Sequence, residues 1–332
     1  MMLTFSTRVS AGLAAVLASC CGNVSGQETP QPQERVHFLT YENDSHYDTD
    51  RFYTNGIQVS TKYSTDQRKP FARSLTNSLC RWLACDDSTL LTSQINVGQL
   101  MYTPRELTVR EPQPLDRPWA GLLYYEQAYA FLSPDQRSLT TLSGQIGVTG
   151  RLSMAEQAQK LVHRVMDRPR PEGWDNQVGG TLGVMASAER RTAREQLSAD
   201  LGHDVRLNTA TYWRLTIGNI QTYAAVGVSV VIGKDLPLVS PPPPGIGNKL
   251  HGSSEARLPG YTSCLAPWLQ CTAFGSVEAR LVAYNVFLDG RLLQDDPSIK
   301  KRNFVSDLVL GTRFDFPGTA PPTTARGSSS SR

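Results

Sequence analysis

The sequence predicts an all-β protein, and three observations lead to that prediction. Apolar and polar residues alternate with a period of two in many segments, which is the pattern of a strand with one apolar face. The connections between these segments are very unequal in length, as they are in outer-membrane barrels. No apolar run approaches the roughly 20 residues that a membrane-spanning helix needs. A membrane role would therefore depend on strands.

The alternation is clearest in the second half of the chain. The segment Val226 to Ile232 has an aliphatic residue at every second position, and Leu308 to Phe316 repeats the pattern with Arg313 and Asp315 on the opposite face. A charged face opposite an apolar one suits a barrel with a lipid-facing exterior and a wet interior. In a soluble sandwich the apolar face would point inward. The alternation alone is compatible with both folds.

Other strand candidates extend along the whole chain. They run through residues 36–41, 56–63, 94–101, 122–131, 139–148, 182–189, 209–217, 273–280 and 282–288. The stretch Ser240 to Glu255 contains four consecutive prolines and several glycines, so it predicts an exposed loop.

The first 26 residues are typical of an export signal. Arg8 precedes the apolar segment Ala11 to Ala18, and small residues follow around Gly26, where a peptidase could cut. We therefore expect a signal peptide at 1–26, a barrel at 27–316 and a disordered tail at 317–332. Cys20 ends a sequence similar to a lipoprotein processing site; the alternative is an incidental cysteine inside the signal.

The four cysteines that remain once the signal is removed form two close pairs, Cys80 with Cys85 and Cys264 with Cys271. In an oxidising compartment each pair can close a short loop, and the alternative is four unpaired thiols. Neither pair has the companions of a metal site. The net charge of +3 is too small to indicate a nucleic-acid partner.

One segment departs from the β pattern. Ser153 and Glu156 have the spacing of a capping box, and apolar residues recur with a helical period up to Val165, before two prolines. Gln159 and His163 are four residues apart and share one face of this predicted helix. His163 could act as a general base, because imidazole titrates near neutral pH. The alternative is an ordinary hydrogen-bonded or solvated histidine.

A polar turn between residues 41 and 63 brings oxygen-rich side chains together. Asn43 and Asp44 end one predicted strand, and Thr54 and Asn55 begin the next. Hard oxygen donors suit Ca²⁺, with an amide or hydroxyl left to position a substrate carbonyl or water. The alternative is ordinary hairpin chemistry, because these residue types also favour turns.

A second polar loop, between residues 102 and 121, carries Arg105, Arg110 and Arg117. Arginines bind phosphate through forked hydrogen bonds, and an anionic lipid headgroup would supply that phosphate. The alternative is that Asp116 and Arg117 pair with their neighbours and fix the loop.

A series of short motifs resembles the outer-membrane lipid A deacylase family in order and spacing, over roughly residues 36 to 180. The motifs are Glu42-Asn43-Asp44, Asp50 to Gly56, Gly98-Gln99 with Tyr102-Thr103-Pro104, Asp116 to Gly121, Gly147 to Gly150, Gln159 with His163, and Gly173 to Gln177.

The resemblance implies a barrel of about twelve strands that removes the 3′-linked acyloxyacyl group from lipid A by calcium-dependent ester hydrolysis. By position, His163 would be the general base and Asp44 would hold the Ca²⁺. Asn43 and Thr54 would line the site and orient the ester, and Arg110 would meet the lipid A phosphates. The implied location is the outer membrane of a Gram-negative cell, and we expect a monomer.

Two positions depart from the family pattern. A carboxylate that can follow the histidine is replaced here by Pro169, which leaves Asp167 or Glu172 nearby; we predict Glu172 as a metal ligand. Val109 replaces one member of a basic pair before Arg110. Two rival functions remain at this stage. One is a non-catalytic pore or structural barrel, and the other is a calcium-dependent outer-membrane phospholipase, which needs a nucleophilic serine.

Overall fold

The computed structural model describes residues 3–8, 35–43, 55–63, 66, 68–203, 205–234, 236–239, 263–266 and 269–315. These residues form one thirteen-stranded antiparallel sheet with the order β1-β2-β3-β4-β5-β6-β7-β9-β10-β12-β11; β13 also pairs with β12, and β8 with β9. Long neighbouring strands are thus mostly consecutive in sequence, which is the up-and-down order of outer-membrane barrels.

The strands alternate with a few helices. The strands are β1 (Leu3–Arg8), β2 (Arg35–Asn43), β3 (Asn55–Tyr63), β4 (Thr89–Tyr102), β5 (Ala120–Leu132), β6 (Ser138–Thr149), β7 (Leu182–Ala193), β8 (Ala199–Asp200), β9 (Val205–Gly218), β10 (Gln221–Lys234), β11 (Ser263–Ala266), β12 (Leu269–Asn285) and β13 (Phe304–Asp315). The α-helices are α1 (Pro70–Leu83), α2 (Ala155–Val165) and α3 (Val286–Asp289), and the short 3₁₀ turns are η2 (Gly150–Ser153), η3 (Gly173–Asn176) and η4 (Glu195–Leu197).

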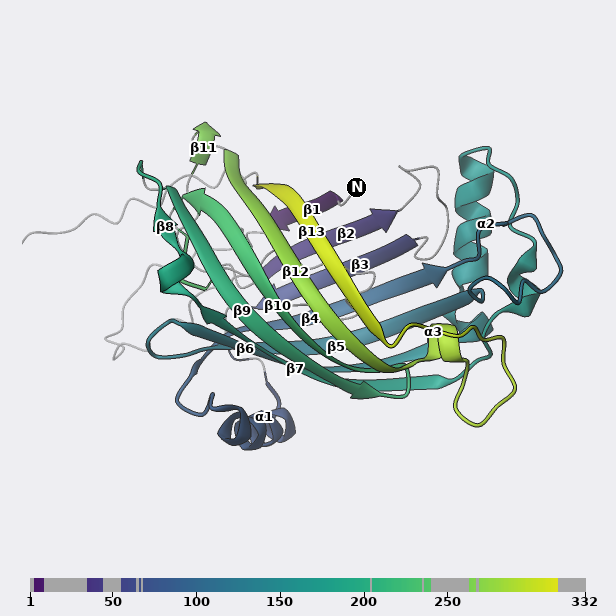
Figure 1. Cartoon of the computed structure of the whole chain (residues 1–332), viewed down its shortest axis with the longest axis horizontal. Coiled ribbons are helices and arrows are strands. Elements are labelled where there is room, and N and C mark those ends of the chain that lie inside the picture. Colours follow the sequence, from purple (N-terminus) through teal and green to yellow (C-terminus); the bar gives the residue numbers. More distant parts are fainter. Residues whose placement is uncertain are drawn as a thin grey trace, which may run out of the picture.

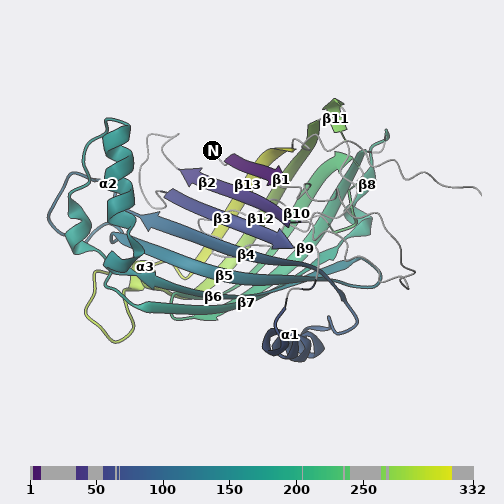
Figure 2. The same ribbon diagram turned by 180° about the vertical axis from the view of Figure 1, so that it is seen from behind.

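The sheet is strongly curved. Figures 1 and 2 show β1 to β3 facing β10, β12 and β13 across the interior, with α2 at one end of the strands and α1 at the other. The predicted all-β barrel is confirmed. The described strands number thirteen where about twelve were expected; two of them, β8 and β11, are only two and four residues long, which leaves eleven longer strands. Among the described residues, no helix has the length and apolarity to span a bilayer.

The two faces of the sheet show which way the barrel is turned. The outward rows expose aliphatic residues to an extent that a soluble sandwich would not tolerate, for example Val226 at 60 % and Leu310 at 75 %. The inward rows bury polar side chains such as Lys62, Asn96 and Glu126. Apolar outside and polar inside is the arrangement of a barrel in lipid.

The expected domain limits are only partly covered by these residues. β1 lies within the segment expected to be an export signal and pairs with β2 from Leu3↔Tyr41 to Arg8↔Val36. Cleavage of that signal stays a prediction, as does lipidation at Cys20, which lies outside the described residues. The loop at 240–255 and the tail at 317–332 also lie outside them.

One prediction about strands was wrong, and one helix was missed. The segments 273–280 and 282–288 were expected as separate strands, but β12 runs unbroken to Asn285, whose side chain then accepts a hydrogen bond from Phe287 N (3.0 Å) and starts α3. The helix α1 was not predicted at all. Cys80 and Cys85 do form a disulfide, as expected, while the side chains of Cys264 and Cys271 are outside the described part.

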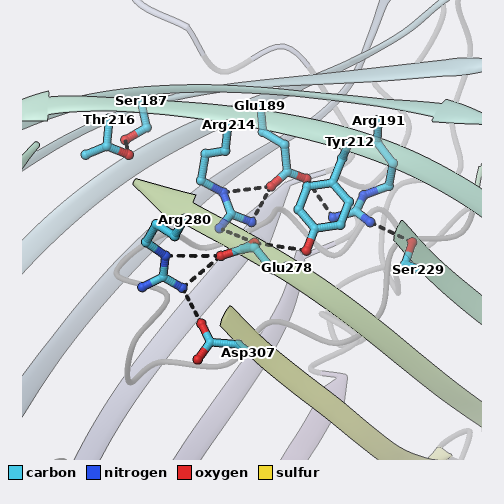
Figure 3. Close-up of polar contacts among 10 residues, drawn as sticks. All are labelled: Ser187, Glu189, Arg191, Tyr212, Arg214, Thr216, Ser229, Glu278, Arg280 and Asp307. Atoms are coloured by element: carbon cyan, nitrogen blue, oxygen red, sulfur yellow. Dashed lines mark hydrogen bonds and ion pairs between the residues drawn. The ribbon is translucent and has the colours of Figure 1, made fainter. Parts of the chain in front are cut away.

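The interior beside β7, β9 and β12 contains a continuous chain of ion pairs, which we call the lumenal ladder (Figure 3). Glu189 pairs with Arg191 (2.9 Å) and Arg214; Arg214 then reaches Glu278 (3.2 Å). The ladder continues from Glu278 to Arg280 (2.8 Å) and from Arg280 to Asp307 on β13 (2.7 Å). Its members come from four strands, so the ladder ties that side of the barrel together.

Candidate active site

The start of helix α2 packs against the barrel wall at the first residues of β5. Gln99 donates a hydrogen bond to the Ser153 carbonyl (2.6 Å), and the Ser153 hydroxyl donates to the Gly150 carbonyl (2.6 Å). A Cβ atom at Gly121 would collide with both Ser153 and Ala155, so the start of the helix approaches the barrel wall more closely than any other residue at position 121 would allow.

The predicted capping box is wrong. The residue before α2 is Met154, whose φ of 57° is left-handed and whose side chain forms no cap. The Ser153 hydroxyl oxygen accepts a hydrogen bond from the Ala155 backbone N–H (3.4 Å), which is not the capping-box contact with Glu156. The Ser153 hydroxyl is engaged with Gly150, and Glu156 instead forms an ion pair with Lys160 one turn later. The helix therefore begins at Ala155 and not at the serine.

The buried face of α2 is more polar than its exposed face. Gln159 and His163 are buried, at 3 % and 7 % exposure, and they follow Ala155 at intervals of four residues. The apolar residues that gave the helix its sequence signal are exposed instead: Leu161 at 58 % and Val165 at 77 %. A helix with its aliphatic residues exposed suits contact with lipid, because aliphatic side chains among acyl chains are not exposed to water.

The ring of His163 is fixed by a backbone carbonyl. Its Nδ1 lies 2.7 Å from the carbonyl oxygen of Pro169. Because a carbonyl oxygen can only accept, Nδ1 carries the hydrogen, and the neutral ring then has its lone pair on Nε2. A histidine oriented in this way can accept a proton at Nε2.

An aromatic cluster supports the same helix face. Trp174, in η3, donates its indole N–H to the Gln159 side-chain oxygen (2.7 Å) and lies 5.0 Å from the ring of Trp119. A Cβ atom at Gly173 would collide with the Trp119 indole. Trp119 and Trp174 were part of the recognised motifs, but their roles as supports for Gln159 were not predicted; a buried amide opposite an indole leaves no distinct sequence signal.

The three arginines of the loop between residues 102 and 121 make two kinds of contact. Arg117 is 9 % exposed and its guanidinium packs 4.3 Å from the centre of the Tyr102 ring. Asp116 accepts hydrogen bonds from the backbone N–H groups of Arg105 (2.8 Å) and Arg117 (2.7 Å). This part of the loop matches the alternative in which Asp116 and Arg117 fix its shape.

Arg110 lies differently, on the surface near α2. Its side chain is 75 % exposed and forms an ion pair with Glu172 (3.3 Å), which also approaches Arg170 (3.6 Å). The Arg105 side chain is 69 % exposed and lies 3.9 Å from the Glu106 carboxylate. The two exposed arginines are thus available to an anionic group outside the barrel.

The predicted oxygen cluster is placed mainly through the backbone; of its side chains, Asn55 donates an amide hydrogen bond to the Tyr41 hydroxyl (3.0 Å). Asn43 ends β2 and pairs with Asn55, Asn55 pairs with Met101, and Met101 pairs with Gly121 beneath α2. With strands about 4.8 Å apart, this row puts the end of β2 about 14 Å from the base of α2, at the same rim. The side chain of Asn43, and all of Asp44 and Thr54, lie outside the described residues.

No group of three or more His, Cys, Asp or Glu side chains that could hold a metal ion occurs within the described part of the chain. The predicted ligand Glu172 is held by two guanidinium groups, and the other predicted ligand, Asp44, is not described. The Ca²⁺ site therefore stays a prediction.

A curved antiparallel sheet with an apolar exterior, a polar interior and a helix against one rim defines an outer-membrane β-barrel. The sequence model of the family described as "Outer membrane protein LpxR" matches residues 10–326, so the chain belongs to this family of outer-membrane proteins. This is the lipid A deacylase family that the motifs resemble.

A solved structure gives the same fold. LpxR from Salmonella typhimurium superposes with a TM-score of 0.61 and 19 % sequence identity, over 85 % of this chain and 89 % of that chain. At this identity the likeness establishes the fold alone. No protein in the curated set matches the chain.

Proposed function

We propose that the protein is an outer-membrane esterase that removes the 3′-linked acyloxyacyl chain from lipid A by histidine-activated attack of water. The observation that carries the proposal is the inverted α2. Its buried face turns Gln159 and His163 toward the barrel wall, while its aliphatic residues Leu161 and Val165 are exposed. The ester would reach the base from the side of the barrel wall, and the aliphatic side of the helix would contact the surrounding acyl chains.

His163 takes the proton of the attacking water at Nε2 and later returns it to the departing hydroxyl group of lipid A. The Pro169 carbonyl holds the Nδ1–H and supports the imidazolium during the step. It performs, at the same sequence position, the orienting work that a carboxylate can perform elsewhere in the family. A carbonyl carries no full charge, so it stabilises the imidazolium less than a carboxylate would.

Asn43 and Thr54 are proposed to orient the ester and its oxyanion from the end of the β2–β3 hairpin. A bound Ca²⁺ would lower the energy of the negative charge that develops on the ester oxygen. Asp44 is its main proposed ligand. Glu172 can join Asp44 only when its ion pairs with Arg110 and Arg170 open.

The anionic glucosamine phosphates of lipid A are assigned to Arg110 and Arg105, the two exposed guanidinium groups of the loop. Arg117 was predicted as a third phosphate ligand. Its stacking on Tyr102 favours a role in holding the loop that presents the other two.

The proposal is tested by replacing the base. We expect His163→Ala to lower lipid A deacylation by about 10² to 10⁴, the usual contribution of general-base catalysis. The readout is mass spectrometry of lipid A and phospholipids from cells that carry each variant. His203→Ala, an exposed turn residue, is the matched control and should retain wild-type activity.

Three results would overturn the proposal. His163→Ala as active as wild type would exclude the histidine mechanism. Unchanged lipid A in cells with the wild-type protein would favour a non-catalytic barrel. Loss of acyl chains from glycerophospholipids instead of lipid A would favour the phospholipase.

A further inference from the structure

The helix α1 lies on the outside of the barrel wall. The disulfide of Cys80 and Cys85 is buried against Phe131 and Leu142. In β5, Phe131 belongs to the row opposite the inward-facing Glu126, and Leu142 is in register with Tyr129 of that same outward row. The helix therefore covers outward-facing residues and does not plug the lumen.

The C-terminal end of α1 is attached to the same wall. Arg190, on the outward row of β7, donates hydrogen bonds to the carbonyls of Leu83 (2.6 Å) and Ala84 (2.7 Å). These carbonyls are at a helix end, where they lack intrahelical partners and carry partial negative charge. A disulfide and an arginine clamp thus hold the helix in one orientation.

Held in this way, α1 exposes a stripe of large apolar side chains. Trp82 is 89 % exposed, Phe71 79 %, Leu75 49 % and Leu79 40 %. Their spacing of four, four and three residues places them along one side of the helix. In water such a stripe on a short, fixed helix would be unfavourable.

The polar residues of α1 lie on the other flank. At about 100° per residue, Thr76 and Cys80 form the buried face, the apolar stripe lies to one side of it and Arg73, Asn77 and Arg81 lie to the other. The helix contains two arginines and no acidic residue. A helix that lies flat at a membrane surface has this cross-section, with one flank toward the acyl chains and one toward water and the headgroups.

The apolar stripe is next to the lipid-facing surface of the barrel. The outward rows that α1 covers at Phe131 and Leu142 continue along β5 and β6 to Tyr125 and Ile146, which are 40 % and 55 % exposed. Figures 1 and 2 both place α1 at the opposite end of the strands from α2. The stripe is thus at the edge of the membrane band, at the end remote from the site.

We propose that α1 is an interfacial anchor whose stripe of Phe71, Leu75, Leu79 and Trp82 is inserted among the phospholipids of the leaflet opposite the active site. The choice of leaflet rests on the proposed function, because α2 then meets lipid A in the outer leaflet. The insertion itself rests only on the attachment, exposure and flanks of α1.

The depth of Trp82 tests the proposal. The protein is reconstituted in vesicles of phosphatidylethanolamine and phosphatidylglycerol whose acyl chains carry bromine either near the headgroup or near the chain end. The fluorescence of Trp82 is obtained by subtracting the fluorescence of the Trp82→Phe variant from that of the wild-type protein. We expect headgroup-proximal bromine to quench this signal at least twofold more than chain-end bromine.

Two controls make the result specific. Trp213, on the outward row of β9, gives a reference for a residue on the barrel wall through Trp213→Phe. The double variant F71S/L75S should reduce quenching of Trp82 at least twofold, whereas L292S/L293S, in the exposed β12–β13 connection, should leave it unchanged. Repeating the measurement on His163→Ala makes it independent of deacylation, so the two proposals can fail separately.

Either of two results would overturn the anchor. Quenching of Trp82 by aqueous iodide but not by bromolipid would place the stripe in water. Shielding from both quenchers, with a crosslinked dimer in the same vesicles, would show that a second copy of the chain covers it.

Discussion

The lumenal ladder and the rim beside α2 contain the same residue types in opposite states. In the ladder, Arg214 and Glu278 are 3 % and 1 % exposed, and each has partners on other strands. At the rim, the Arg110 side chain is 75 % exposed and pairs with the Glu172 carboxylate. Buried charges that pair with one another stabilise the barrel wall, and exposed charges at the surface are available to a ligand. Charge density in the sequence does not distinguish the two states.

The largest expected difference between the regions is in stability. Arg214→Leu leaves Glu189 and Glu278 buried without their shared cation, so it should lower the free energy of unfolding by about 3–5 kcal/mol. Arg110→Leu, at the rim, should change it by no more than about 0.5 kcal/mol. Urea unfolding of both variants in phospholipid vesicles measures the contrast. Equal losses would show that the ladder is no more important to the fold than a surface pair.

A second variant acts on activity at the rim. Gln159→Leu removes the acceptor of the buried Trp174 N–H, and we expect deacylation to fall about tenfold, the equivalent of about 1.4 kcal/mol. Gln157→Leu, on the exposed part of the same helix, is the control and should not alter the rate. If both variants behaved alike, the Trp174 contact would not be positioning the helix.

The pair of Asp296 and Arg291 is intermediate between the ladder and the exposed rim arginines. It lies in the β12–β13 connection near the rim, but its two charged groups are hydrogen-bonded to each other. The hydrogen bonds from the Arg291 side chain (2.6 and 2.8 Å) lower the pKa of Asp296 below its ordinary value. A carboxyl with a lowered pKa stabilises the fold above its unfolded-state pKa, and this contribution is lost as the pH falls through the folded-state value.

We expect Asp296→Asn to cost about 1 kcal/mol at neutral pH. The difference from wild type should shrink as the pH falls through the acidic range. Thermal or urea unfolding over a pH series checks the prediction, with the exposed Asp295→Asn as the control. A difference that is independent of pH would show that the charge of Asp296 is not what holds the loop.

The smallest expected effect concerns Glu172. Because two arginines already share its carboxylate, Glu172→Gln should raise the calcium concentration for half-maximal deacylation only about threefold, within the range of a partly exposed ion pair. Glu106→Gln, an exposed carboxylate of the same loop, should not change it. Calcium titration after chelation measures both variants, and a tenfold or larger rise would make Glu172 a principal ligand.

The strands could be predicted because their alternation is local and repeated. Their ends could not, as Asn285 shows: only the fold reveals that β12 continues to it before α3 begins. The helix α1 was missed although Pro70, at its first position, and the spacing of Phe71, Leu75 and Leu79 are helical signals. Those signals are short, and other start signals are missing, because Lys69 at the N-cap forms no side-chain cap and the first turn contains no acidic residue.

The residues of the candidate site could be predicted from the sequence more fully than the contacts that those residues make. His163 was chosen from its place on a helix and from the family motifs, but its partner is the Pro169 carbonyl, and any residue would supply a carbonyl there. The three arginines of the loop look equivalent in sequence. They separate only when Tyr102 and Asp116 are brought against Arg117 and the other two are left outside.

The ladder has one more consequence, for ion permeation. A barrel wide enough to leave an aqueous channel would leak solutes across the envelope. Here guanidinium and carboxylate groups from β7, β9, β12 and β13 occupy the interior beside one wall and bind one another, so they narrow the lumen, and their three positive and three negative charges cancel. Single-channel recordings of the reconstituted protein should accordingly show a smaller conductance than an open pore with the same number of strands.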